Sequence, residues 1–398
     1  MALDVDFLLI PLLAVLAPLL TRTFGRWLPI PVVVFELLLG MITGPAVLGW
    51  VTPSDFAATL ADFGLAMLFF VAGAEIEFTV IRGHSGRRAI GGWFLSLALG
   101  LAAGWVLSPG EPAVFIGIAL CSTAFGTLLP ILRDAGELHT PFGRTVAAVG
   151  AVGEFAPLVA ISVFLGGRDP GLATIVLALF IVLAAGAIWY ALRGPHGALH
   201  RVMNATLHTS GQFAVRVLLL ILAALVVLSV VLDLDMLLGA FAAGVVWQLL
   251  MRNAQPADRE AVESKVEAVA FGFLVPIFFV YTGVTFDLQA LVADPILLVL
   301  VPAGALLLLL VRGLPAMLAA PAGATVRDRW SVAFMGATGL PIIVAVTAIG
   351  VTADVLPSGP AAALVAAGML SVLLFPLLAM MIRRERVDAA AAAVDERL

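Results

Sequence analysis

The sequence has few charged residues and little of what soluble enzymes use to build reactive sites. Asp, Glu, Lys and Arg make up 12% of its 398 residues, whereas a soluble domain typically contains about 25%. Its one cysteine, Cys121, excludes an intrachain disulfide and any site that needs several cysteines. Its five histidines all fall in expected loops, and no metal or nucleophile constellation lies at depth. We therefore expect neither an enzyme nor a protein with a bound cofactor.

Hydrophobic residues, at 62%, dominate the chain instead, and the mean hydropathy is +1.14. Several apolar runs reach about 20 residues, the length that crosses a hydrocarbon core of about 30 Å. Because lipid offers the backbone no hydrogen bonds, each run is predicted to be a helix. We expect an all-α polytopic membrane protein with thirteen transmembrane helices, at about 5–24, 29–49, 55–79, 88–108, 112–133, 142–166, 171–193, 211–232, 235–251, 261–284, 291–320, 328–351 and 359–382.

The distribution of arginine predicts the orientation in the membrane. An odd number of helices puts the two termini on opposite sides. If the amino terminus is outside, the outer loops contain Arg168 alone and every other loop arginine is inside. We therefore expect a multi-pass protein of the cytoplasmic (inner) membrane, in contact with lipid, with a short cytoplasmic tail at 384–398. The first residues, MALDVDF, lack a basic region and a cleavage site, so we expect no cleaved signal peptide.

Three pairs of segments, each seven helices apart, indicate an internal repeat. Because seven is odd, the two copies must be inverted in the membrane, and they cover about 29–166 and 235–382. Chance similarity between apolar segments is the alternative, but all three pairs keep one order. The pairs are ELLLGMITG (36–44) with MLLGAFAAG (236–244), FGLAMLFFVAGAEIEF (63–78) with FGFLVPIFFVYTGVTFDL (271–288), and FGTLLPIL (125–132) with ATGLPIIV (337–344).

Two of the expected helices, the fifth and the twelfth, carry helix-breaking residues at matching places. The residues are Gly126 and Pro130 in the fifth and Gly339 and Pro341 in the twelfth. Proline removes a backbone donor and glycine permits unwinding. Each helix taken alone could simply be kinked at its proline. A symmetric pair of broken helices in inverted repeats instead indicates a secondary transporter, whose freed backbone groups hold the ion.

Three charged residues fall deep inside expected helices, where charges are costly and mark functional sites. Glu154 lies at the middle of its helix, and Arg312 is the only cation that we expect to be buried deep within a helix. A buried Glu154–Arg312 pair that only fixes helix packing is the alternative. Glu36 lies seven residues into the second helix, and we expect it to have a packing or access role.

Hydroxyl side chains also lie at the expected helix breaks. Ser122 and Thr123 come before Gly126, and Thr338 comes before Gly339. Such hydroxyls either bond back to their own helices or supply oxygen ligands to an ion. Sodium and potassium are hard cations that prefer carboxylate, carbonyl, hydroxyl and water oxygens.

Five stretches carry a family resemblance: FELLLGMITGPAVLG (35–49), GLAMLFFVAGAEIE (64–77), CSTAFGTLLPIL (121–132), GELHTPFGRTVAAVGAVGE (136–154) and PIFFVYTGVTFDL (276–288). The chain resembles, over nearly its whole length, the cation:proton antiporter-2 family of sodium/proton and potassium/proton exchangers. The resemblance implies a single transmembrane domain, 1–383, in which a core of helices 4–6 and 11–13 moves against a dimerisation domain of helices 1–3 and 8–10. Helix 7 is the linker, the expected partner is a second copy, and no nucleic acid or nucleotide-binding domain is expected.

Members of that family carry a paired motif in the sixth helix, commonly Asp-Asp, Asn-Asp or Gln-Asp. The pair falls here on Gly153 and Glu154, so the resemblance implies that Glu154 is the ion-binding acid and Arg312 the family's basic residue. It also matches Ser122 and Thr123 to the hydroxyls at the first break. Gly153 departs from the motif, which leaves the ion and the stoichiometry open.

The expected function is antiport of Na⁺ or K⁺ against protons by alternating access. One buried carboxylate, Glu154, would bind either the cation or the proton, but not both at once. Gly153 cannot titrate and Arg312 stays charged, so we expect electroneutral exchange. Other transporters share the chemistry: a sodium-coupled organic-anion symporter would use Arg312 for its substrate, and a channel would carry currents far above carrier rates. A sensor that has lost transport is a further alternative. Exchange in vesicles separates these possibilities.

Overall fold

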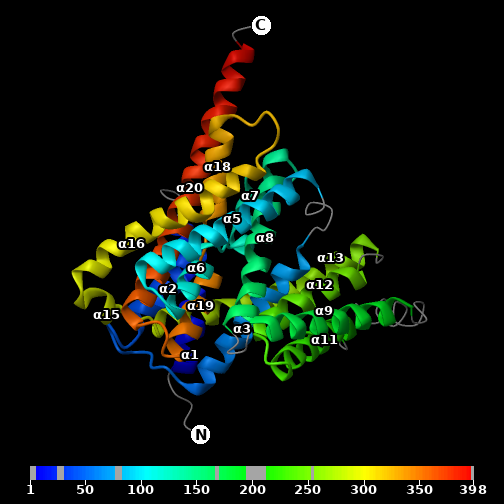
Figure 1. Ribbon diagram of the computed structural model, residues 1–398, viewed down its shortest axis with the longest axis vertical. Coiled ribbons are helices and arrows are strands. Elements are labelled where there is room, and N and C mark those ends of the chain that lie inside the picture. The colour runs from blue at the N-terminus through cyan, green and yellow to red at the C-terminus, as the bar shows by residue number, and fades with distance from the viewer. Residues whose placement is uncertain are drawn as a thin grey trace. The chain divides into compact units, whose positions relative to one another are not determined.

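The computed structural model describes residues 6–24, 31–76, 83–165, 170–193, 212–251 and 255–395, and every regular element within them is a helix (Figure 1). Within these residues, nine helical segments are long and apolar enough to cross a membrane, and four shorter apolar helices accompany them. The expectation of an all-α fold is therefore confirmed. The four shorter segments are Leu8–Phe24, Val32–Thr43, Gly171–Gly186 and Met236–Met251.

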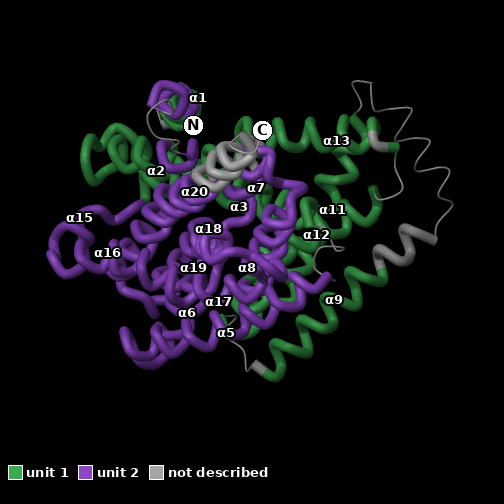
Figure 2. Tube along the Cα trace, turned by 90° about the horizontal axis from the view of Figure 1, so that it is seen from above, with its two compact units in different colours: residues 1–17, 36–76, 158–285 green, residues 18–35, 77–157, 286–398 purple. Residues whose placement is uncertain are grey.

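The chain divides into two compact units, each assembled from separate stretches of sequence (Figure 2). Unit 1 comprises Met1–Ala17, Glu36–Ile76 and Leu158–Thr285, and unit 2 comprises Pro18–Phe35, Glu77–Pro157 and Phe286–Leu398. Three helices, α1 (Asp6–Phe24), α2 (Val32–Thr43) and α8 (Pro141–Phe164), run across a boundary between the two.

Unit 1 holds the main part of α2 and a set of helices that pack through glycine. A Cβ atom on Gly40 of α2 would collide with the carbonyl of Val280, and one on Gly244 would collide with the carbonyl of Phe70. Close backbone approach of this kind is the usual way in which membrane helices associate. The other helices of unit 1 are α3 (Asp55–Ala74), α9 (Pro170–Arg193), α11 (Phe213–Val231), α12 (Met236–Met251), α13 (Pro256–Val269), η1 (Ala270–Leu274) and α14 (Val275–Val284).

Unit 2 is built around two interrupted helices. In the first, α6 (Glu111–Leu120) and α7 (Phe125–Asp134) are separated by residues 121–124, which we call the first break. In the second, α18 (Val326–Ala337) and α19 (Pro341–Thr352) are separated by residues 338–340, the second break. Around them lie α5 (His84–Leu107), most of α8, α15 (Leu288–Ala293), α16 (Pro295–Leu308), η2 (Leu309–Gly313), α17 (Leu314–Ala316), η3 (Met317–Ala319) and α20 (Ser358–Asp395).

The positions of the breaks differ in part from those expected. Pro341 is the first residue of α19 and Gly339 lies in the second break, whereas Pro130 lies inside α7 and Gly126 in its first turn. Proline at the first position of a helix removes a donor that would have no intrahelical partner, so it starts α19 without cost. The chain also stays helical beyond the expected end at residue 382, because α20 continues to Asp395.

Wide turns interrupt two of the long helices. The segments η1 and η2 are π-helical, and Arg312 lies within η2. Single π-helical turns of this kind are frequent at functional sites. The π-helical turn therefore draws attention to Arg312, the basic residue that also interrupts an apolar run of the sequence.

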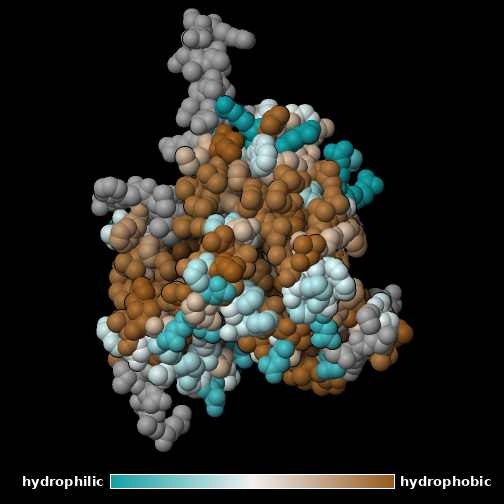
Figure 3. Space-filling model, turned by 60° about the vertical axis from the view of Figure 1, so that its left-hand side comes forward, coloured by the Kyte–Doolittle hydropathy of each residue, from teal (hydrophilic) through white to brown (hydrophobic). Residues whose placement is uncertain are grey.

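The surface is rich in large hydrophobic side chains, which cover broad areas in Figure 3. Exposed examples are Phe94 and Trp105 on α5, Ile175 and Val182 on α9, and Val299 on α16. Soluble proteins rarely expose apolar patches of more than a few hundred Å². The surface therefore fits contact with lipid.

Candidate functional site

The two breaks of unit 2 are bonded directly to each other. The backbone N–H of Ala124 in the first break donates to the carbonyl of Thr338 in the second, over 2.7 Å. The hydroxyl of Thr123 donates to the carbonyl of Gly336, over 2.6 Å. Each break thus satisfies backbone groups that the other leaves without a helical partner, as the apolar surroundings require.

Arg312 reaches the first break from η2 and has no exposed surface. Its Nε donates to the hydroxyl of Thr123 over 2.8 Å, and its Nη2 donates to the carbonyl of Val149 on α8, also over 2.8 Å. Nη1 has no hydrogen-bond partner among the described residues. The Thr123 hydroxyl therefore accepts from Arg312 while it donates to Gly336, and it links η2 to both broken helices.

Gly153 lies where α8 passes the first break. Its carbonyl accepts from the backbone N–H of Thr123, over 2.9 Å. That carbonyl has no partner within α8, because the residue four positions on is Pro157, which has no N–H to donate. A Cβ atom at position 153 would collide with Nη2 of Arg312 and would lie 2.7 Å from the Cβ of Thr123. The absent side chain thus leaves the space that Arg312 and Thr123 occupy.

Glu154 follows directly, in the middle of α8, and only 1% of its surface is exposed. The residue before it is bonded to the first break, so the carboxylate is carried on the α8 turn that adjoins the break. An ionised carboxylate in apolar surroundings is costly unless it is neutralised or paired. Its burial therefore makes an ionised Glu154 without a counter-charge costly.

The other two hydroxyls at the breaks bond to their own helices. Ser122 donates to the carbonyl of Ala119 over 2.8 Å, and Thr338 donates to the carbonyl of Phe334 over 3.0 Å. Both residues are fully buried. A Cβ atom on Gly339 would lie 3.2 Å from the Ser122 hydroxyl, so the breaks approach each other closely there as well. Each hydroxyl oxygen keeps lone pairs that an ion could use.

Glu36, the remaining acid expected at depth, lies in α2 within unit 1 and is buried. The residues discussed above, from Ser122 to Thr338, all lie in unit 2. Within the described residues no cluster of three or more His, Cys, Asp or Glu could hold a resident metal ion.

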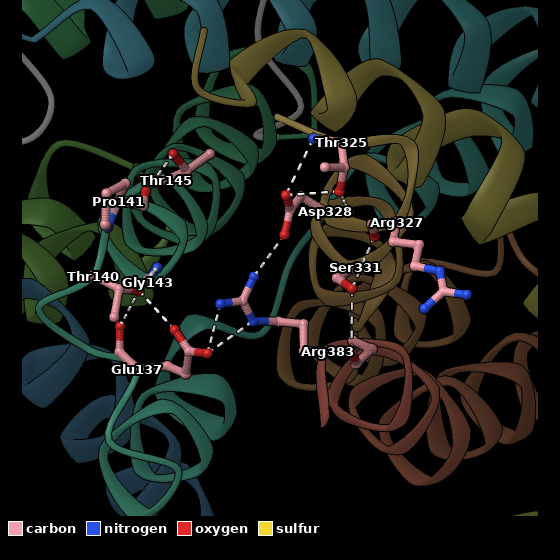
Figure 4. Close-up of polar contacts among 11 residues, drawn as sticks. Glu137, Thr140, Pro141, Gly143, Thr145, Thr325, Arg327, Asp328, Ser331 and Arg383 are labelled. Atoms are coloured by element: carbon pink, nitrogen blue, oxygen red, sulfur yellow. Dashed lines mark hydrogen bonds and ion pairs between the residues drawn. The ribbon is translucent and has the colours of Figure 1, made fainter. Parts of the chain in front are cut away.

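A second polar site, which sequence reasoning missed, joins helix ends of unit 2 (Figure 4). Arg383 of α20 donates from Nε to Glu137 over 2.9 Å and from Nη1 to Asp328 over 2.9 Å. We call Glu137, Asp328 and Arg383 the charge network. Asp328 also forms a capping box with Thr325 at the start of α18. The only signal in the sequence was the GELHTPFGR stretch (136–144), which contains Glu137.

The chain is similar to named antiporters. It is 28% identical to the protein YjbQ of Bacillus subtilis, which carries the name of a Na(+)/H(+) antiporter, over 92% of this chain and 61% of that one. It is 30% identical to the Na(+)/H(+)-K(+) antiporter GerN of Bacillus cereus, over 65% of this chain and 66% of that one. The chain thus spans somewhat less than two thirds of the length of these relatives.

The fold is that of a solved antiporter. The structure of the sodium proton antiporter MjNhaP1 from Methanocaldococcus jannaschii matches 96% of this chain and 99% of that one, with a TM-score of 0.67 and 17% identity. The family model described as "Sodium/hydrogen exchanger, transmembrane" matches residues 12–380. The chain is therefore a multi-pass membrane protein that belongs to the sodium/hydrogen exchanger transmembrane family, a family of transporters rather than enzymes.

Proposed function

We propose that the protein exchanges a monovalent cation, Na⁺ or K⁺, for a proton by alternating access. The observation that carries the proposal is the buried Glu154 on the turn of α8 whose Gly153 carbonyl is bonded to the first break. Family membership and the names of the relatives YjbQ and GerN support the same activity. Broken helices that cross near buried acids are the usual binding sites of secondary transporters.

The coupling follows from competition at one carboxylate. A buried carboxylate is neutralised by a proton or by a cation, and binding of one excludes the other. Glu154 supplies the charge, and the lone pairs of Ser122 and Thr338 supply further oxygen ligands that suit a hard cation. Arg312 remains a fixed positive charge, because guanidinium is not deprotonated in proteins. One carboxylate then exchanges one proton for one cation, which makes the exchange electroneutral.

The proposed architecture is thirteen transmembrane helices in two inverted repeats. Nine long segments and four shorter apolar helices supply that number. Repeated contacts support the repeat: α2 packs on α14 through Gly40 and Gly283, and α12 packs on α3 through Gly244 and Gly73. If the second helix corresponds to the ninth and the third to the tenth, these two contacts are the same contact seen twice.

Unit 2 then acts as the core that carries the site, and unit 1 as the dimerisation domain against which the core moves. We place the protein in the cytoplasmic membrane as a homodimer, with the amino terminus outside and the carboxyl terminus inside. The side of each loop follows from the arginine distribution of the sequence.

The test is exchange by purified protein in vesicles that enclose a pH-sensitive dye. After a proton gradient is imposed, addition of Na⁺ or K⁺ should dissipate it for wild-type protein. Glu154→Gln should abolish this response, because the amide binds neither ion, while Glu154→Asp should retain it with a changed apparent affinity. The matched control is Glu111→Gln, an exposed acid at the start of α6, which should exchange like wild type. Half or more of the wild-type rate in Glu154→Gln would reject the assignment.

A further inference from the structure

The second break is held by a serine to which neither the sequence pattern nor the proposed mechanism gives a role. Ser371 lies on α20 and has no exposed surface. Its hydroxyl accepts a hydrogen bond from the backbone N–H of Gly339, over 3.1 Å. The hydroxyl hydrogen has two possible acceptors, the carbonyl of Gly368 at 2.7 Å and the carbonyl of Gly339 at 3.1 Å. Both backbone groups of Gly339 therefore face one side chain.

The first break is held in an equivalent way, but by the backbone. Thr123 lies two residues before the start of α7, and Gly339 lies two residues before the start of α19. The N–H of Thr123 is accepted by the Gly153 carbonyl of α8, and the N–H of Gly339 is accepted by Ser371 of α20. In both cases the acceptor belongs to the long helix that follows the broken one.

The N–H of Gly339 thus relies on a single side-chain atom, whereas the N–H of Thr123 is held by a backbone carbonyl. Gly339 is buried, and a buried backbone donor that loses its partner is destabilising. The backbones of α20 and the second break also lie close together, because a Cβ atom on Gly368 would lie 2.9 Å from the Gly339 carbonyl. Without the Ser371 hydroxyl, the backbone of residues 338–340 has to move.

We propose that Ser371 is a positioning residue of the ion site. By holding Gly339, it holds the adjoining Thr338 carbonyl, which accepts from Ala124 and so fixes the first break beside the Glu154 turn. The effect on transport rests on the proposed antiport, whereas the effect on the break does not. Ser371 touches no transported ion and acts through the backbone of the second break.

The variants are Ser371→Ala, which removes the hydroxyl, and Ser371→Thr, which keeps it. The matched control is Ser96→Ala, because Ser96 is equally buried in unit 2 but donates only to Gly92 of its own helix. Two measurements are made on each purified protein: amide hydrogen exchange of the peptide that contains residues 336–343, and cation-driven proton exchange in vesicles at several cation concentrations.

Ser371→Ala should speed amide exchange in residues 336–343 by about tenfold, the factor expected when one buried hydrogen bond is lost. It should raise the apparent KM for the cation several-fold and lower the maximal rate less than the affinity. Ser371→Thr should restore both values toward wild type, and Ser96→Ala should match wild type.

Unchanged amide exchange in Ser371→Ala would overturn the proposal whatever the transport result. Faster amide exchange with an unchanged KM would also overturn it, since the break would then be free to move without affecting the ion. If the wild-type protein exchanges no cation for protons in vesicles, the proposed antiport is wrong. The amide measurement then still decides whether Ser371 holds the second break.

Discussion

At the scale of single residues, Gly153 shows how a missing side chain can define a site. The family resemblance described above implies a polar or acidic residue at this position, before Glu154. In this chain the guanidinium of Arg312 and the side chain of Thr123 take up the corresponding space. The positive charge of Arg312 thus reaches the site from η2, and hydrogen bonds to Thr123 and Val149 hold it there. Glycine at 153 and arginine at 312 are thus structurally coupled.

Gly153→Ala should therefore be destabilising, although alanine is normally the better helix former. Overpacking against Arg312 and Thr123 should lower the free energy of unfolding by about 1–3 kcal/mol, and exchange in vesicles should fall with it. Gly91→Ala is the control, because Gly91 lies in the helix α5 with no atom within 4 Å of an added Cβ. Thermal unfolding in detergent compares the two. Equal stability of both variants would contradict the steric role of Gly153.

The sequence alone could predict which residues are buried but not what they touch. Glu154 and Arg312 interrupt long apolar runs, so their depth follows from hydropathy. The partners of Arg312 are 163 and 189 residues away along the chain, and no local pattern encodes contacts at such separations. A serine in an apolar helical run, such as Ser371, usually bonds to its own helix. Nothing in the sequence therefore indicates its contact with Gly339.

At the scale of helices, most elements follow from periodic signals and their ends from local chemistry. The runs of apolar residues predict the long helices, and Pro341 marks the start of α19. Pro130 misled the prediction of the first break, because a proline inside a helix and one at its start look alike in sequence. The charge network could not be predicted, since Arg383 lies 246 residues from Glu137.

The charge network should stabilise the helix ends of unit 2 more than an exposed ion pair would. Arg383→Ala leaves two carboxylates, Glu137 and Asp328, without their shared cation, and their side chains are only 14% and 11% exposed. We expect the free energy of unfolding to fall by about 2 kcal/mol, between the values for surface and buried pairs. Thermal unfolding in detergent measures the change.

The control for Arg383 is Arg259→Ala, which removes an exposed pair with Glu263 one turn away on α13. That pair should contribute about 0.5 kcal/mol or less. A loss in Arg383→Ala no larger than the loss in Arg259→Ala would show that the network adds no stability beyond that of a surface contact.

At the scale of the whole molecule, the charges at the site determine whether the proposed exchange responds to voltage. Glu154 is the one acid among the residues that unit 2 gathers at the two breaks, and Gly153 cannot titrate. Arg312 keeps its charge through the cycle. A carrier that moves one net charge gains about 2.3 kcal/mol per 100 mV of membrane potential, whereas one-for-one exchange gains nothing.

We therefore expect the Na⁺ gradient that balances an imposed pH gradient to equal it at every membrane potential. The measurement uses vesicles whose potential is clamped with K⁺ and valinomycin at zero and at about −100 mV, with Na⁺ as the exchanged cation. A balance point that moves with the potential would require a second titrating group. Glu36 of α2, also buried, would be the first residue to replace.

The π-helical turn at η2 has a consequence for how this chain is compared with its relatives. A π-turn contains one more residue than the α-helical turn it replaces, so it behaves as a one-residue insertion. Removal of that one residue would turn every side chain after η2 by about 100° around the helix axis. Against a relative whose helix lacks such a turn, an alignment with no gap between Leu309 and Gly313 will thus match residues on different faces of the helix. A comparison with such a relative should place the gap there, so that Arg312 is matched by its position in space.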